Sequence, residues 1–185
     1  MRSISVTEHL FLTGEIQIGK STLLRRFLAE KKQRIAGFRT VWSDGERRTL
    51  HLLPCDGGVC CEENCVAERL SGKLVPRPEI FDRLGPVLLG QPCDLLVMDE
   101  LGFLESAAPA FRSAVLAALD GSIPVVGVIQ PRHTEFLDAV RAHEGVHIVT
   151  VTVENRDTLS LFQSWNDLHE SLFSPVSAKK RYLFR

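Results

Sequence analysis

Residues 14–21 constrain the fold of this chain more than any other stretch, because they read GEIQIGKS and fit the pattern G-x-x-x-x-G-K-S. A short apolar run over residues 9–14 precedes the pattern, and an amphipathic helical pattern over residues 20–32 follows it. In a strand–loop–helix of this kind, backbone N–H groups curl around a phosphate and the helix N-terminus adds partial positive charge. The sequence therefore predicts a phosphate-binding loop made of Gly14, Glu15, Ile16, Gln17, Ile18, Gly19, Lys20, Ser21 and Thr22.

Individual residues of this loop have different expected roles. Gly14 and Gly19 allow backbone angles and a close phosphate approach that a side chain would block. Lys20 is expected to reach the β- and γ-phosphates, and the hydroxyl of Ser21 is expected to bind Mg²⁺. Glu15 is unusual, because a carboxylate near a triphosphate repels it unless the side chain points outward or pairs with a cation.

An acidic pair ends a second apolar run at residues 94–100, which read DLLVMDE. Apolar residues in an unbroken run are typical of a strand buried on both faces. Asp99 is expected to help hold Mg²⁺ beside Ser21, the alternative being a strand-end carboxylate that caps the next turn. Glu100 is placed to polarise an attacking water as a general base, which a hydrolase requires. Lys20, Asp99 and Glu100 are therefore the candidate catalytic residues.

Strand-like apolar runs alternate with helical patterns, which favours an α/β fold with a mostly parallel sheet and helices on both faces. Asp44 and Gly45 are a turn signal between two strand patterns, so an antiparallel hairpin is also expected. Residues 55–77 break the periodicity and are expected to form a Cys-rich insertion or long loop. The expected strands are residues 9–14, 35–43, 47–54, 94–99, 124–129 and 146–153, and the expected helices are residues 20–32, 78–89, 109–119, 134–142 and 155–172.

Length, charge and hydropathy limit the classes of partner that the chain is expected to bind. Its 185 residues suit one domain, expected over residues 1–173, followed by a basic tail at residues 174–185. The net charge of -1, from 22 Lys and Arg against 23 Asp and Glu, speaks against a specific nucleic-acid partner. No apolar stretch has the length of a signal-peptide core or of a membrane span. We therefore expect a cytoplasmic protein without a membrane partner.

Four of the five cysteines lie within eleven residues: Cys55, Cys60, Cys61 and Cys65. Four thiolates can close a tetrahedral Zn²⁺ site or hold an iron–sulfur cluster. The spacing differs from paired C-x2-C motifs, however, and adjacent cysteines strain simultaneous ligation. A metal or redox site and a set of reduced surface cysteines both stay open. Cys93 precedes a buried strand and is expected to be a core thiol.

The order of several short motifs resembles the THEP1 family of P-loop nucleoside-triphosphatases, also called the cancer-related nucleoside-triphosphatase family. The matching pieces are LFLTG…GKSTL (residues 10–23), GFRT (37–40), DLLVMDELGFLE (94–105), PAF (109–111), PVVGVI (124–129) and VTVENR (151–156). The resemblance implies a three-layer P-loop NTPase fold and slow, Mg²⁺-dependent hydrolysis of triphosphates such as ATP or GTP, with broad base tolerance. It also implies that Arg156 lies near the base or the phosphates, the alternative being a salt bridge at a helix start.

Two departures from the family pattern bear on activity. The loop reads GEIQIGKS where the family usually has GxPGxGKT, and residues 41–43 read VWS where the family tends to carry an acidic and then a basic residue. If that basic residue normally assists at the triphosphate, Arg39, Arg47 or Arg48 is a candidate to compensate for it.

Three functions stay open at this point. The first is an NTP hydrolase. The second is a P-loop nucleotide or small-molecule kinase, against which the chain shows no arginine-rich lid segment. The third is a nucleotide-dependent accessory or switch protein with a metal-binding cysteine cluster. The sequence identifies no protein partner.

Overall fold

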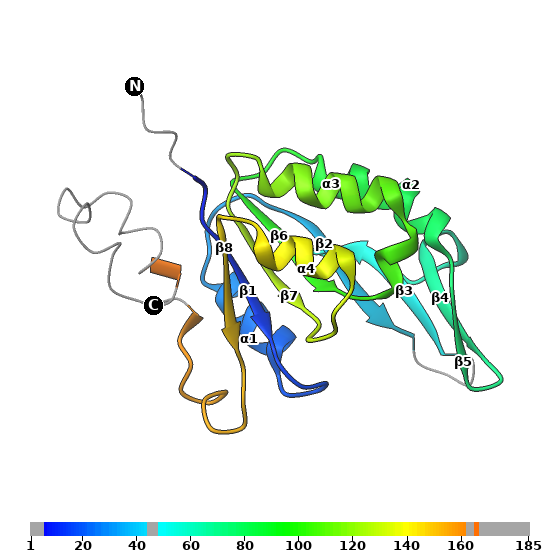
Figure 1. Cartoon of the computed structure of the whole chain (residues 1–185), viewed down its shortest axis with the longest axis horizontal. Helices are drawn as coiled ribbons and strands as arrows, with labels where there is room; N and C mark the ends of the chain where they lie inside the picture. Colours follow the sequence, from blue (N-terminus) through cyan, green and yellow to red (C-terminus); the bar gives the residue numbers. More distant parts are fainter. Residues whose placement is uncertain (1–5, 44–47, 162–164, 167–185) are drawn as a thin grey trace.

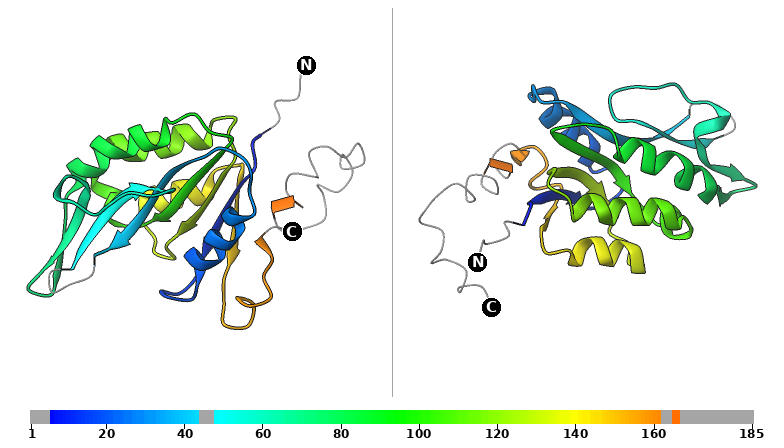
Figure 2. Two further views of the ribbon diagram at one scale, coloured as in Figure 1. Left: turned by 180° about the vertical axis from the view of Figure 1, so that it is seen from behind. Right: turned by 90° about the horizontal axis from the view of Figure 1, so that it is seen from above.

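The computed structural model describes residues 6–43, 48–161 and 165–166. One twisted sheet forms the middle layer, with α1 on one face and α2, α3 and α4 on the other (Figures 1 and 2). The strands are β1 (His9–Thr13), β2 (Ile35–Trp42), β3 (Thr49–Pro54), β4 (Cys65–Leu70), β5 (Lys73–Pro76), β6 (Leu95–Leu101), β7 (Val125–Ile129) and β8 (Val146–Thr150). The helices are α1 (Lys20–Ala29), α2 (Pro78–Leu89), α3 (Pro109–Leu119) and α4 (Glu135–Ala142), with 3-10 turns η1 (Glu62–Asn64) and η2 (Leu104–Ala107).

The sheet has the order β5-β4-β3-β2-β6-β7-β1-β8. Strands β2, β6, β7, β1 and β8 run parallel, whereas β3, β4 and β5 extend the sheet by antiparallel pairing. The expected three-layer fold with a mostly parallel sheet and an antiparallel part is confirmed. Because parallel strands end at the same edge, the loops after β1, β6 and β7 meet there.

Residues 55–77 do not form the irregular insertion that we expected. They contain η1, β4 and β5, and β4 buries Val66 and Ala67 in the core on the α2 face. Ser71 and Gly72, both with positive φ, form the two-residue turn between β4 and β5. The sequence pattern did not predict these strands, because they are short and because glycines and prolines lie close to them in the chain.

Two apolar clusters hold the layers together. On one face, α2 and α3 pack on the sheet, and the lack of a side chain at Gly85 lets the two helices approach, since a Cβ there would lie 2.1 Å from Phe111. On the other face, α1 contributes Leu24 and Phe27, which lie against β1, β6 and β7. The phosphate-loop helix is therefore fixed to the centre of the sheet by its apolar side.

The C-terminal segment differs from the expected helix where the structure describes it. Residues 153–158 form turns where we expected a helix to begin at residue 155. Half of the expected helix, the whole basic tail and the Asp44–Gly45 turn lie outside the described residues. The limits of the domain stay a prediction. Within the described residues, the helices are too short or too polar to cross a membrane.

Candidate active site

The loop between β1 and α1 takes the shape that the motif predicts. Gly14 has a φ of 136°, and a Cβ there would lie 2.4 Å from the carbonyl oxygen of Val151, so a side chain has no room. Gly19, at φ 110°, is the N-cap of α1, and Gln17 also has a positive φ. These angles turn the chain sharply at the helix N-terminus, where unpaired N–H groups attract an anion.

Lys20 lies at the base of this loop and is largely buried. Its Nζ donates to the carbonyl oxygens of Gly14, at 2.9 Å, and Glu15, at 2.6 Å. Burial lowers the pKa of the amine, while the carboxylates of Glu100 and Asp99 act in the opposite direction. A buried amine that donates to carbonyl oxygens can exchange these neutral partners for an anion, with which it makes stronger hydrogen bonds.

Ser21 and Asp99 come together across the sheet edge. The Ser21 hydroxyl donates to Oδ1 of Asp99 at 2.8 Å, although 78 positions separate the two residues in the chain. Burial raises the pKa of Asp99, and the neighbouring Glu100 also raises it, while the Ser21 hydrogen bond lowers it. The buried carboxylate would therefore be stabilised by a cation beside it.

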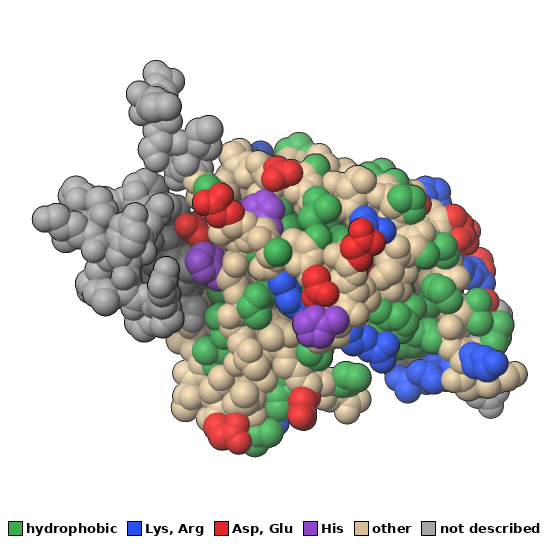
Figure 3. Space-filling view, in the orientation of Figure 1, with side chains coloured by type: hydrophobic (Ala, Val, Ile, Leu, Met, Phe, Trp, Pro, Cys, Tyr) green, Lys and Arg blue, Asp and Glu red, His purple; other side chains and the backbone are tan. Residues whose placement is uncertain are grey.

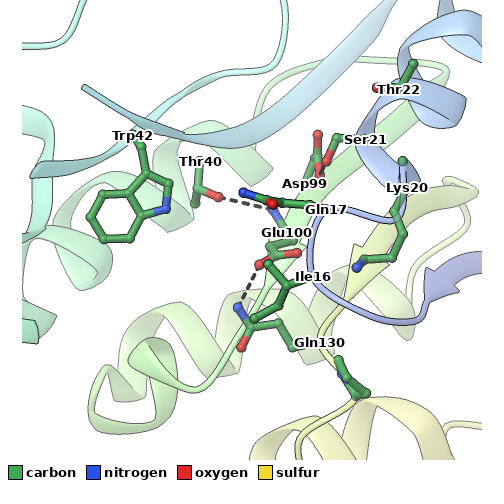
Figure 4. A pocket seen from close by; sticks show the side chains of 12 residues that line it. Ile16, Gln17, Lys20, Ser21, Thr22, Thr40, Trp42, Asp99, Glu100 and Gln130 are labelled. Carbon is green, nitrogen blue, oxygen red and sulfur yellow. Dashed lines mark hydrogen bonds between the residues drawn. The ribbon is translucent and has the colours of Figure 1, made fainter. Parts of the chain in front are cut away.

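Glu100 projects into the same cavity because the end of β6 is irregular. Asp99 pairs with Val128 and Leu101 with Ile129 of β7, so Glu100 is an extra residue in the ladder. Neighbouring strand residues normally face opposite sides of a sheet, and such a bulge re-aims a side chain. Asp99 and Glu100 consequently both line one cavity, of about 330 Å³ (Figure 4).

Four residues that line the cavity were not among the predicted site residues: Thr40, Trp42, Gln130 and Pro131. Gln130 Nε2 donates to Oε1 of Glu100 at 2.6 Å, and Thr40 Oγ1 accepts from the Glu100 backbone N–H at 3.4 Å (Figure 4). Gln130 directly follows the buried strand β7. A rule that polar residues at the ends of parallel strands gather at one edge would have found it.

The predicted loop residues divide into those that face the cavity and those that do not. Ile16, Gln17, Gly19, Lys20, Ser21 and Thr22 line it. Glu15 is exposed and does not line the cavity, whereas Ile18 is buried in the core on the α1 face. The outward position of Glu15 removes the expected conflict between its carboxylate and a bound phosphate.

Arg156 lies in the turn after β8 and does not line the cavity. Its backbone N–H donates to Thr152, and its Nε lies 3.8 Å from a carboxylate oxygen of Asp157. Both side chains are well exposed, so this ion pair adds little stability. A role of Arg156 in nucleotide binding stays a prediction.

The cysteines do not form the metal site that we considered. The described residues contain no group of three or more His, Cys, Asp or Glu side chains placed to hold a metal ion, and all five cysteines are free. Burial raises the pKa of Cys55 to about 11 and also raises that of Cys65 and Cys93, which disfavours the thiolates that a metal needs. Zinc or an iron–sulfur cluster at these positions is therefore unsupported.

Asn64 organises the cysteine segment instead. Its Oδ1 accepts from the Cys61 backbone N–H at 3.1 Å and lies 2.7 Å from Nδ1 of His51 on β3. Its amide donates to the carbonyl oxygen of Val59. Hydrogen bonds from one side chain thus fix this loop to the sheet.

A buried carboxyl group lies close behind the site. Glu105 is 2% exposed and accepts from the Gly102 backbone N–H at 3.0 Å. Its pKa is raised to about 7, mainly by burial and in smaller part by the neighbouring carboxylate of Glu100. A Cβ at Gly102 would lie 2.9 Å from Gln130 Nε2. The turn at Gly102, to which Glu105 is hydrogen-bonded, therefore also packs against the Gln130 side chain.

Comparison with known proteins agrees with this geometry. A family model described as NTPase matches residues 9–162. Nucleoside-triphosphatase THEP1 of Ignicoccus hospitalis is 32% identical over 181 residues, which cover 90% of this chain and 98% of that protein. Nucleoside-triphosphatase THEP1 of Methanosarcina acetivorans is 32% identical over 159 residues, which cover 80% of this chain and 90% of that protein.

Two solved structures share the fold. The crystal structure of THEP1 from Aquifex aeolicus has a TM-score of 0.66 at 22% identity and covers 82% of this chain and 94% of its own. The solution structure of a human cancer-related nucleoside triphosphatase has a TM-score of 0.65 at 23% identity and covers 94% of this chain and 100% of its own. With a family model that matches most of the chain, these findings show that the chain belongs to the THEP1-type family of nucleoside-triphosphatases.

Proposed function

We propose that this nucleoside-triphosphatase uses Mg²⁺ to hydrolyse nucleoside triphosphates to nucleoside diphosphates and inorganic phosphate. The reaction takes place in the cavity between α1 and the ends of β6 and β7. One observation carries the proposal: the Ser21 hydroxyl lies 2.8 Å from Asp99 Oδ1, next to Glu100 and opposite the phosphate loop. A pair of oxygen ligands and a neighbouring acid are the parts that metal-assisted phosphate hydrolysis needs.

The loop and Lys20 bind the phosphate chain in this proposal. The backbone N–H groups of residues 14–21 and the N-terminus of α1 face the β-phosphate, and Gly14 and Gly19 leave space for it. Lys20 exchanges its two carbonyl partners for β- and γ-phosphate oxygens. Burial strengthens this contact because the amine is partly removed from water.

The donor set fits Mg²⁺. Ser21 offers a hydroxyl and Asp99 a carboxylate, and hard oxygen ligands are those that Mg²⁺ prefers. A cation here would offset the burial that raises the pKa of Asp99. When bound, Mg²⁺ would neutralise charge on the phosphates. Ser21 and Asp99 are the residues that would hold it.

Glu100 acts as the general base. Its carboxylate accepts a proton from a water while the water oxygen bonds to the γ-phosphorus and the bond to the β-phosphate oxygen breaks. Gln130 holds the carboxylate toward the cavity through its 2.6 Å hydrogen bond. No contact among the described residues favours the kinase or the cysteine-cluster alternative.

Phosphate release from ATP, GTP, CTP and UTP tests the proposal. We expect slow release from all four with Mg²⁺, and loss of release when the metal is chelated. No phosphate from any triphosphate, or the same rate after chelation, would contradict it.

The free cysteines support the further proposal of a reducing, cytoplasmic compartment.

A further inference from the structure

The nucleotide cavity has few positive charges for the ligand that it would hold. Among the described residues that line it, Lys20 is the cation, against the carboxylates of Asp99 and Glu100. A triphosphate adds several negative charges, which a single lysine and one divalent cation leave incompletely balanced. A further cation at the end of the cavity away from Lys20 would complete the balance.

Trp42 marks that end of the cavity. It lies on β2, which pairs with β6 on the side away from β1, and adjacent strands are about 4.8 Å apart. Thr40 and Trp42 are two positions apart, so both face the cavity. Figure 4 shows the indole beyond Thr40, with its nitrogen on the side of Glu100. A phosphate chain that starts at the loop and ends at Glu100 therefore points toward Trp42.

Arg48 lies against this indole. Its guanidinium carbon is 5.4 Å from the centre of the Trp42 ring, within the range of a cation–π contact. The carbonyl oxygen of Arg48 accepts from the Arg69 backbone N–H at 3.0 Å, which ties the residue to β4. Among the described residues, no carboxylate pairs with the Arg48 side chain. Figure 3 shows that Lys and Arg side chains gather at the end of the sheet where β4 and β5 lie.

We propose that Trp42 and Arg48 form a sensor for the γ-phosphate: the guanidinium, held on the indole, contacts the terminal phosphate of a bound nucleoside triphosphate and not the diphosphate product. This inference rests on the proposed function. An arginine stacked on a ring is preorganised, so it loses little freedom when it binds a phosphate. Trp42 thus positions Arg48, and Arg48 distinguishes substrate from product.

Fluorescence tests the sensor directly, because the chain has 2 tryptophans. In a Trp165→Phe variant, which keeps an aromatic ring against Phe27, emission reports Trp42 alone. We expect a non-hydrolysable triphosphate with Mg²⁺ to change this emission and the diphosphate to leave it nearly unchanged. Calorimetry on the same sample measures binding. Absence of binding refutes the proposed function, whereas triphosphate binding with unchanged emission refutes the sensor alone.

Turnover of variants provides the second test. Since a hydrogen bond to a charged group is worth about tenfold or more, we expect Arg48→Ala to lower kcat/KM for triphosphate by about that factor, with diphosphate affinity unchanged. Arg48→Lys should recover part of the loss, and Trp42→Ala should lower kcat/KM as Arg48→Ala does. Arg69→Ala is the matched control, because it removes the same charge from the neighbouring strand, and we expect wild-type kinetics. Equal effects of the Arg48 and Arg69 variants, or none from Arg48, would overturn the sensor.

Discussion

The phosphate loop and the cysteine segment are both short, glycine-containing and rich in residues that bind ligands, yet only the first forms a candidate site. The loop is clamped between β1 and α1, so its Gly14 and Gly19 angles and its direction follow from local chain geometry. The cysteine segment joins strands of the antiparallel extension, and Cys65 belongs to β4 itself. The thiol groups of the cysteine segment therefore lie in different local environments.

The comparison shows when a motif can be trusted. A phosphate loop needs backbone N–H groups at a helix N-terminus, and a strand–loop–helix supplies them in one continuous stretch. A four-thiolate site needs four side chains at one point in space, which spacing alone does not provide. Five predictions test or sharpen this difference, in order of expected effect.

The largest effect is expected in the loop itself. Lys20→Ala should abolish triphosphate binding and turnover, because Lys20 is buried and the proposed function places its amine beside the phosphates. Calorimetry and phosphate release measure the two properties. Lys73→Ala, an exposed lysine on β5, is the control and should behave like wild type. Full activity of the Lys20 variant would remove the phosphate-loop assignment.

Glu100→Gln should separate binding from chemistry. The amide cannot accept the proton from water, so turnover should fall by about 10²-fold or more while nucleotide affinity stays near that of wild type. Single-turnover phosphate release and calorimetry measure this split, with Glu79→Gln on α2 as the control. Unchanged turnover would exclude Glu100 as the base.

Glu105 should make stability depend on pH. Burial raises its folded-state pKa from 4.5 to about 7, so the folded chain binds this proton more tightly than the unfolded chain does. Its contribution is complete below the unfolded value and is lost as the pH rises through about 7. Glu105→Gln cannot ionise, so its free energy of unfolding relative to wild type should increase from pH 5 to pH 8, by on the order of a few kcal/mol. Denaturant unfolding that gives parallel pH curves for the two proteins would contradict the assignment.

Gln130→Ala should loosen the base without removing it. A hydrogen bond to a charged group is worth about 1.5 kcal/mol or more, so kcat should fall about tenfold with little change in KM. Steady-state kinetics provide the measurement. A rise in KM with an unchanged kcat would show instead that Gln130 contributes to substrate binding.

Replacing Cys60 and Cys61 by Ser should have the smallest effect. The described residues place no metal group there, so turnover should stay within about twofold of wild type and purified protein should lack bound zinc or iron. Metal analysis of anaerobically purified protein and phosphate release check both points. Stoichiometric metal that the double variant loses would restore the cysteine site.

The sequence anticipated the elements that carry strong local signals. Helices α2 and α3 begin at Pro78 and Pro109 as expected, because proline favours the first turn of a helix. The expected contact between Ser21 and the acidic strand is present, since parallel strands around a phosphate loop end at one edge. The roles assigned to Lys20, Asp99 and Glu100 stay predictions.

Other parts of the site depend on which strands lie side by side. Thr40, Trp42 and Gln130 enter the cavity because β2 and β7 flank β6, and this order follows from long-range pairing. The direction of Glu100 depends on a register shift against β7 that no pattern in residues 94–100 reveals. The strands β4 and β5 likewise depend on antiparallel pairing, of β4 with β3 and of β5 with β4.

By itself, the chain's sequence determined the phosphate loop, the acidic strand end and the alternation of strands and helices, because each depends on residues close together in the chain. Only the tertiary structure decided which side chains meet: Gln130 on Glu100, Glu105 on Gly102, and Arg48 on Trp42. Those contacts join segments that strand order and packing bring together. The distance between such segments in the folded chain cannot be predicted from local sequence patterns.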